Sequence, residues 1–131
     1  MTFEDIRKTV EVRMAAWATA KTISVAYDNV KPSFDTAALD KWVRCTIIDG
    51  DSFTAGIGSD PCVRRVGLVS MQIFTRRDKG SLAAREIATS LASHWEYYQS
   101  GGFSTQAARL INVGPDDNYY QLNLQVGFTA D

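Results

Sequence analysis

The chain contains 131 residues, with fourteen Lys or Arg against fifteen Asp or Glu and a formal net charge of −1 at pH 7. A chain of this length normally folds around one core, so we expect a single domain spanning residues 1–131. The near-neutral charge excludes a general attraction to nucleic-acid backbones or anionic membranes. The sequence also has no secretion signal and no apolar run long enough for a membrane span, so we expect no membrane partner.

The first predicted element is an amphipathic helix beginning at Phe3. Apolar residues recur at steps of three and four, and charged residues occupy the opposite side. Thr2 is placed to cap this helix, with Asp5 as its capping-box partner. The expected buried stripe consists of Phe3, Ile6, Val10, Met14 and Trp17.

Two strands separated by a long connection are predicted in the middle of the chain. After a short strand at Ile23–Tyr27 and a loop at Asp28–Asp40, the β-branched segment Trp42–Ile48 reads as a strand. The alternating segment Arg64–Thr75 should pair with it as a hairpin. Between them, Asp49–Cys62 carries three glycines and a proline without a regular period, which is typical of a long loop.

The last third of the chain predicts a second helix and two more strands. Ser81 is placed to cap the helix, and Ser100-Gly101-Gly102 would end it. Strands are expected at Phe103–Val113 and Tyr119–Phe128, joined by a turn at residues 114–118. The resulting order, α-β-β-β-α-β-β, predicts an α+β domain with a mixed, mostly antiparallel sheet and two helices on one face. The expected buried stripe of the helix consists of Ala83, Ile87, Leu91, Trp95 and Tyr98.

No residue combination predicts catalysis, and we expect no cofactor or metal. His94 is the only histidine and reads as a flanking residue, which excludes a two-histidine zinc site within one subunit. Asp49 and Asp51 lack the further acids of a calcium loop and fit a strand-end turn better. Gly56 and Gly58 lack the lysine of a phosphate loop.

The two cysteines, Cys45 and Cys62, are not in a metal-binding spacing. We expect a chain without a leader to stay in a reducing compartment, where thiols remain free. Both cysteines are therefore predicted to be structural and to pack as small apolar residues.

Basic pairs and tyrosines are candidates for contact surfaces. Arg64-Arg65 and Arg76-Arg77 bracket one predicted strand, and they could face solvent, a neighbouring subunit or nucleic acid. Tyr97, Tyr98, Tyr119 and Tyr120 suit an interface, although packing within the fold accounts for them equally well.

Read end to end, the sequence resembles the phage tail-terminator-like family, whose fold is that of the minor tail protein capping the phage lambda tail tube. The resemblance covers nearly the whole chain and rests on five segments in order. The segment from Tyr27 to Trp42 departs from it, because more proline is expected there than Pro32 alone. The matching segments are MTFEDIRKTVEVRMAAWA, WVRCTIIDGDS, RRVGLVSMQIFT, SLAAREIATSLASHW and NVGPDDNYYQLNLQVGF.

This resemblance implies a non-catalytic assembly protein of a phage or prophage tail. Such proteins form a ring, usually of six copies and in some cases only on the tail, that caps the tail tube and ends its polymerisation. The partners implied are other copies of the chain, the tail-tube protein and a head-completion protein. The location implied is the virion tail, after assembly in the bacterial cytoplasm.

The charged residues suggest where subunits would meet. A ring of head-to-tail contacts needs two different surfaces on each subunit. We hypothesise that Asp49 or Asp51 of one subunit meets Arg64 or Arg65 of the next, with the loop 50–61 contributing to the same surface.

Two other functions stay open at this point. A head–tail connector or stopper subunit would have portal-side partners instead of the tube. A small nucleic-acid-binding module would use the basic pairs, although the neutral net charge and the missing binding motif argue against it.

Overall fold

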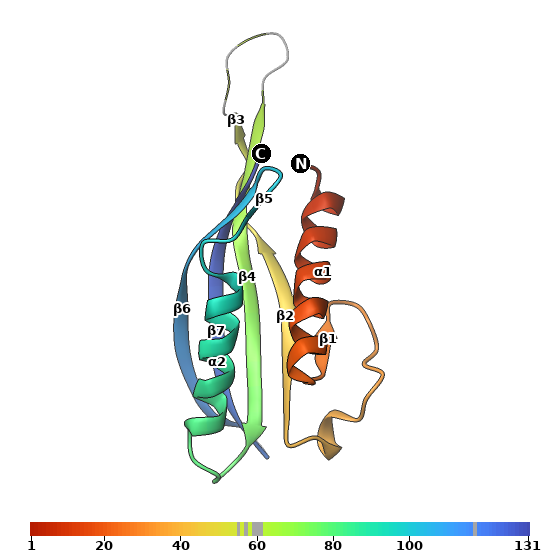
Figure 1. Ribbon diagram of the computed structural model, residues 1–131, viewed down its shortest axis with the longest axis vertical. Helices are drawn as coiled ribbons and strands as arrows, with labels where there is room; N and C mark the ends of the chain where they lie inside the picture. The colour runs from red at the N-terminus through yellow and green to blue at the C-terminus, as the bar shows by residue number, and fades with distance from the viewer. Residues whose placement is uncertain (55, 57, 59–61, 117) are drawn as a thin grey trace.

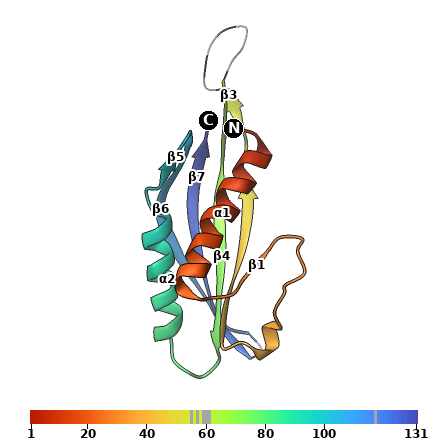
Figure 2. The same cartoon turned by 45° about the vertical axis from the view of Figure 1, so that its right-hand side comes forward.

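The computed structural model describes residues 1–54, 56, 58, 62–116 and 118–131. It confirms the predicted α+β class: a sheet in the order β1-β2-β4-β7-β6-β5, with β3 paired to β4, carries two helices. Both helices lie on the same face of this sheet (Figures 1 and 2). The elements in chain order are α1 (Phe3–Lys21), β1 (Val25–Tyr27), η1 (Thr36–Ala38), β2 (Lys41–Asp49), β3 (Phe53–Thr54), β4 (Val63–Arg76), α2 (Leu82–Trp95), β5 (Gln99–Ser100), β6 (Phe103–Asp116) and β7 (Tyr119–Ala130).

Helix α1 begins with the predicted capping box. The Thr2 hydroxyl accepts a hydrogen bond from the Asp5 amide, and the Asp5 carboxylate accepts one from the Thr2 amide. The predicted stripe is buried except for Phe3, which is 56% exposed. Phe3 occupies the first turn, where the helix reaches the end of the sheet, so this part of the prediction was wrong.

The predicted hairpin of β2 and β4 is confirmed. These strands pair antiparallel from Lys41 opposite Thr75 to Asp49 opposite Gly67. Strand β1 adds to the other side of β2 in the parallel direction, but only opposite Val43–Cys45. The connection Asp49–Cys62 is not a plain loop as predicted, because β3 pairs with Val63 and Arg64 and extends the hairpin. Residues 55, 57 and 59–61 of this connection lie outside the described part of the chain.

Helix α2 buries Ile87, Leu91 and Trp95 as predicted, together with Ala84 and Ala88. Ala83 is exposed and Tyr98 lies beyond the end of the helix, so the prediction was wrong at these two positions. Ser81 occupies the N-cap position, but its side chain makes no capping hydrogen bond. Ser100-Gly101-Gly102 does not end the helix, which stops at Trp95. Gly101 and Gly102 instead have φ of 51° and 95° and form the two-residue turn between β5 and β6.

Strand β7 is the centre of the C-terminal half. It pairs with β4 on one side and β6 on the other, both antiparallel. Strand β6 continues to Asp116, so residues 114–116 belong to the strand and not to the turn predicted there. A register shift between Asn112 and Gly114 accommodates this extension. The alternation predicted for β7 is confirmed, with its apolar set facing the helices: Leu122, Leu124, Val126, Phe128 and Ala130.

Candidate assembly surface

The four charged residues predicted at a subunit contact gather at one end of the sheet. Asp49 is the last residue of β2, Asp51 follows it, and Arg64 and Arg65 stand near the start of β4. The first turn of α1 and the end of β7 reach the same end, beside β3 (Figure 1). We call this region, Asp49, Asp51, Arg64 and Arg65 with the exposed rings of Phe3 and Phe53, the end surface.

Arg64 has an ionic partner within its own chain. Its Nε lies 2.6 Å from Oδ1 of Asp131, and its Nη2 lies 3.4 Å from Oδ2. Hydrogen bonding between the two groups raises the pKa of Arg64 and lowers the pKa of Asp131. Both side chains are substantially exposed, so the pair is expected to contribute little to stability.

Arg65 is held by three groups of its own chain. Its Nε donates to the Met1 carbonyl at 3.1 Å, and its Nη1 donates to the Ser52 hydroxyl at 3.0 Å. Its guanidinium lies 4.1 Å from the centroid of the Phe3 ring. Arg65 thus fixes the start of α1 against the hairpin of β3 and β4.

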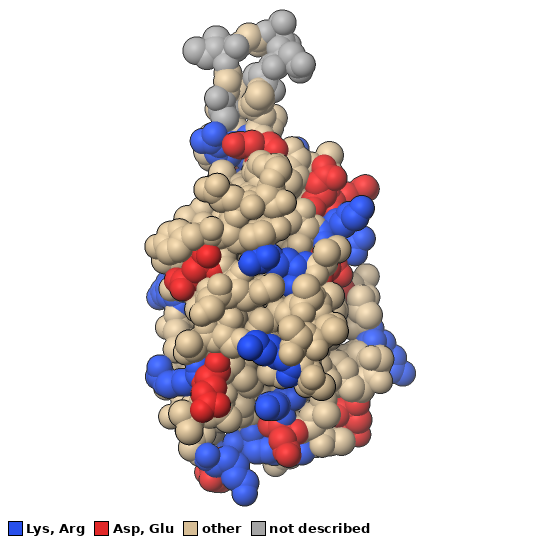
Figure 3. All heavy atoms as spheres, in the orientation of Figure 1, with Lys and Arg blue, Asp and Glu red and all other residues tan. Residues whose placement is uncertain are grey.

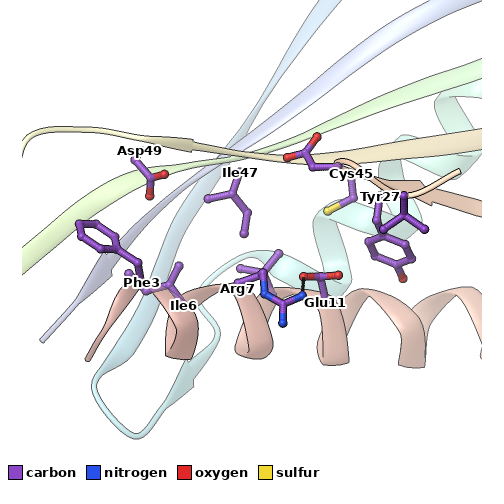
Figure 4. Close-up of a pocket in the computed structure, with 11 residues that line it drawn as sticks. Phe3, Ile6, Arg7, Glu11, Tyr27, Cys45, Ile47 and Asp49 are labelled. Atoms are coloured by element: carbon purple, nitrogen blue, oxygen red, sulfur yellow. Dashed lines mark hydrogen bonds and ion pairs between the residues drawn. The ribbon is translucent and has the colours of Figure 1, made fainter.

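The carboxylates of Asp49 and Asp51 have no such partners. Neither forms an ion pair within the described residues. Asp49 points toward α1 and Phe3 (Figure 4). The structure therefore brings the four predicted residues to one end, where both arginines have partners in their own chain and both aspartates are available to a neighbour's cation.

A groove of about 310 Å³ opens beside Asp49, between α1 and the edge of the sheet. Its apolar lining includes Ile6, Val10 and Ile47, and Arg7 bridges to Glu11 at 2.9 Å on its rim (Figure 4). Burial, with smaller effects of Asp28 and Glu11, raises the pKa of the Cys45 thiol in this groove to about 12. A thiol with so high a pKa stays protonated at neutral pH and serves as an apolar packing group, as predicted for Cys45. Cys62 is exposed, so the same prediction was wrong for it.

Comparison with known proteins decides the family. A family model described as phage tail terminator protein matches residues 5–116. This chain belongs to the phage tail terminator protein family. The match runs from the first turn of α1 to the end of β6.

A solved structure supports the fold of this tail terminator chain. One protein of known structure superposes with a TM-score of 0.77 over 100% of this chain and 96% of its own, at 21% sequence identity. At that identity the likeness concerns the fold alone. No curated protein sequence matches the chain.

Family membership implies a role in ending the tail tube and a contact with that tube, which suggests a place in the virion tail. The family is one of structural proteins and not of enzymes. Within the described residues, no three potential metal-ligating side chains gather. In the same part of the chain, no helix has the length and apolarity needed to cross a membrane.

The two basic pairs of the terminator do not form one surface. Arg65 and Arg76 stand near opposite ends of β4, roughly 36 Å apart at the rise of an extended strand. Arg76 donates to the Ala37 carbonyl at 2.9 Å, lies 3.3 Å from Asp40 and covers the Tyr119 ring. Arg76 therefore fastens the loop 28–40 to the sheet. The charged side chains of both signs are also interspersed on the face seen in Figure 3.

His94 has a structural role that its sequence position did not reveal. Its Nε2 lies 2.9 Å from the Arg13 carbonyl, and the Arg13 guanidinium donates to the His94 carbonyl. The guanidinium also lies 3.5 Å from the Tyr98 ring centroid. His94 and Arg13 thus join the two helices, and burial lowers the pKa of His94.

Proposed function

We propose that this protein forms a ring that caps the finished tail tube, stops further addition of tube subunits and presents a surface to the head-completion protein. The observation that carries the proposal is the family match over residues 5–116. The mechanism requires shape and charge complementarity but no reaction: one ring face binds the tube, and the other cannot accept another tube ring.

We further propose that the functional domain extends beyond the matched segment to residue 131. Strand β7 lies between β4 and β6, and its apolar residues form part of the core under both helices. A unit that ended at residue 116 would lack the central strand of its C-terminal half.

The end surface is proposed as part of the contact between neighbouring subunits in the ring. Its available groups are the carboxylates of Asp49 and Asp51, beside the exposed rings of Phe3 and Phe53. Arg64 or Arg65 of the neighbour would be one source of the matching cation. Because both arginines are held in their own chain, such a pair would have to share or replace these internal contacts.

Native mass spectrometry of the purified protein, alone and with the tail-tube protein of the same genome, tests the function. We expect a closed ring, either free or only on tube ends, and tube growth that stops when the ring is bound. A protein that stays monomeric and ignores the tube would contradict the proposal. Binding to portal-side proteins without tube binding would identify a connector instead.

Charge reversal tests the direct ion pair at the end surface. The ion pair predicts that the R64E/R65E variant loses the ring and that R64E/R65E/D49R/D51R, which restores opposite charges, recovers it. The matched control is K79E/R85E, which reverses two exposed charges at a distance from the end surface. If R64E/R65E forms rings as well as the natural chain does, Asp49 and Asp51 do not pair with these arginines.

A further inference from the structure

The sheet has an open backbone edge on each side, and these edges suggest how a ring would close. On one side, β6 is fourteen residues long but pairs with β5 only at Phe103 and Ser104. Farther along, the Thr105 amide donates to the Tyr98 carbonyl and the Ala108 amide to the Glu96 carboxylate. Beyond Ala108, no backbone hydrogen bond satisfies the outer side of β6 within the described residues.

The opposite edge is the end of β2. Strand β1 covers only Val43–Cys45, so Ile47, Ile48 and Asp49 have no backbone partner on that side among the described residues. Unpaired strand edges readily accept another strand. The two edges therefore offer complementary halves of one backbone ladder.

Strand direction favours joining these two edges head to tail. Strand β2 is antiparallel to β4, β4 to β7 and β7 to β6, so β6 runs opposite to β2. Rotation about an axis roughly along the strands preserves their directions, and a neighbour's β6 would meet β2 in the antiparallel sense. Each subunit would use two different edges, which is the kind of contact that closes rings.

The hydrogen-bonding groups and the side-chain faces match in the same register. The Ala108 amide points outward to Glu96, so by alternation the backbone groups of Leu110 and Asn112 also point outward. The Val43 amide points outward to Ser24, so those of Ile47 and Asp49 do too. On both strands these residues lie on the helix side of the sheet, because Val43, Ile47, Ala108 and Leu110 contribute to or pack against the core. Pairing them therefore keeps all helices on one face of the joined sheets.

Side chains favour one particular alignment, with Leu110 opposite Asp49. It places Ile111 of one copy beside Ile48 of the other, which is 45% exposed in the single chain. It also places Arg109 opposite Gly50, which has no side chain, so the long Arg109 side chain meets no side chain directly across the joint. The register shift after Asn112 falls where β1 begins to cover β2, so the added strand can bend away there.

We propose that neighbouring copies of this chain join by antiparallel addition of β6, residues 109–112, to the free edge of β2, residues 47–49. This inference rests on the proposed ring. In this arrangement the neighbour's β4, with Arg64 and Arg65, lies three strand spacings from β2, roughly 14 Å. Arg64 and Arg65 are then not required for ring closure.

Disulfide crosslinking tests this contact directly. We would prepare I48C/I111C in a C62S background, with the buried Cys45 retained, and oxidise it mildly in the presence of the tube protein. A non-reducing gel should show a covalent ladder that ends at the ring size. A disulfide within one chain is excluded because positions 48 and 111 lie in strands separated by β4 and β7.

Controls separate this contact from others. I48C and I111C alone should not crosslink, and an equimolar mixture should stop at dimers, because the two edges differ. I48C/L82C is the matched control, since Leu82 is exposed but lies in α2 and should give no ladder. R64E/R65E should retain the ring, because the neighbour's β4 lies away from this contact.

Two negative results have different meanings. Rings that form while I48C/I111C gives no ladder would overturn the strand-edge contact and leave the terminator function standing. A protein that forms no ring and does not bind the tube would overturn both.

Discussion

Individual side chains show how burial separates residues of the same type. Cys45 lies under α1 in the groove, and burial raises the pKa of its thiol to about 12, whereas Cys62 is exposed just before β4. The sequence does not distinguish the two cysteines, because neither has a spacing that indicates a metal site or a disulfide. Only the packing of distant segments distinguishes them.

The two thiols should therefore differ in reactivity. At pH 8 only about one Cys45 thiol in ten thousand is ionised at a pKa of about 12, and the burial of the sulfur blocks approach further. Maleimide labelling followed by intact mass should modify the native chain once, and the folded C62S variant should remain unlabelled. In denaturant C62S should take up one label. Rapid labelling of folded C62S would contradict the burial of Cys45.

Elements are joined in this fold by a few polar contacts besides the core. Trp17 of α1 donates to the Ser90 hydroxyl of α2 at 3.0 Å, and Arg13 and His94 bridge the same helices nearby. The helices reach each other because both pack on one face of the sheet (Figure 2). A sequence-based interpretation of His94 as a flanking residue found no function for it because its partner Arg13 lies 81 residues away.

This helix contact predicts a dependence of stability on pH. Burial, followed by the charge of Arg13, lowers the folded-state pKa of His94 below 6.5 despite its hydrogen bond to Arg13. The unfolded chain then binds the proton more readily, so the stabilisation is fully present above about pH 6.5 and is lost as pH falls through the folded pKa. Urea unfolding between pH 7.5 and 5.5 should show decreasing stability, and H94Q should show a smaller decrease. If the stability of H94Q decreases with falling pH as steeply as that of the natural chain, His94, the one histidine of the sequence, is not the source of the pH dependence.

At the scale of the whole molecule, β7 holds the C-terminal half together. It pairs along twelve positions with β4 and contributes buried side chains such as Leu122, Leu124 and Phe128. Each large buried side chain is worth about 2–5 kcal/mol when truncated. The free-energy cost of losing all the buried side chains of β7 would therefore exceed the total free energy of unfolding of such a domain, roughly 5–15 kcal/mol.

A chain of residues 1–116, which keeps the family-matching segment, should accordingly fail to fold. We expect poorly dispersed amide signals in its NMR spectrum and no cooperative thermal transition. The matched control is residues 1–130, which loses the exposed Asp131 partner of Arg64 but retains β7. A cooperative transition in the 1–116 chain would show that the domain ends before β7.

Elements whose signals are local can be predicted from the amino-acid sequence alone. The capping box of Thr2 and Asp5, the helical period of α1 and the alternation of β7 each depend on residues a few positions apart, and each is confirmed. The order of the long elements follows from these patterns, as does the family resemblance. Turn chemistry was less informative, since Gly101-Gly102 suits a helix end and a hairpin equally well.

Contacts between segments that are distant in the sequence depend on the folded arrangement. It exposes Phe3 and Ala83 at the margins of otherwise correct buried stripes. It pairs Arg64 with Asp131, 67 residues away. Among the described residues, it leaves the outer sides of β2 at residues 47–49 and of β6 at residues 109–112 without a backbone partner. Periodicity states which side of an element is apolar, but the extent of burial and the choice of ionic partner depend on which surfaces fold against each other. These contacts are set by the packing of the whole sheet with its helices, so they cannot be predicted from any short segment of the sequence.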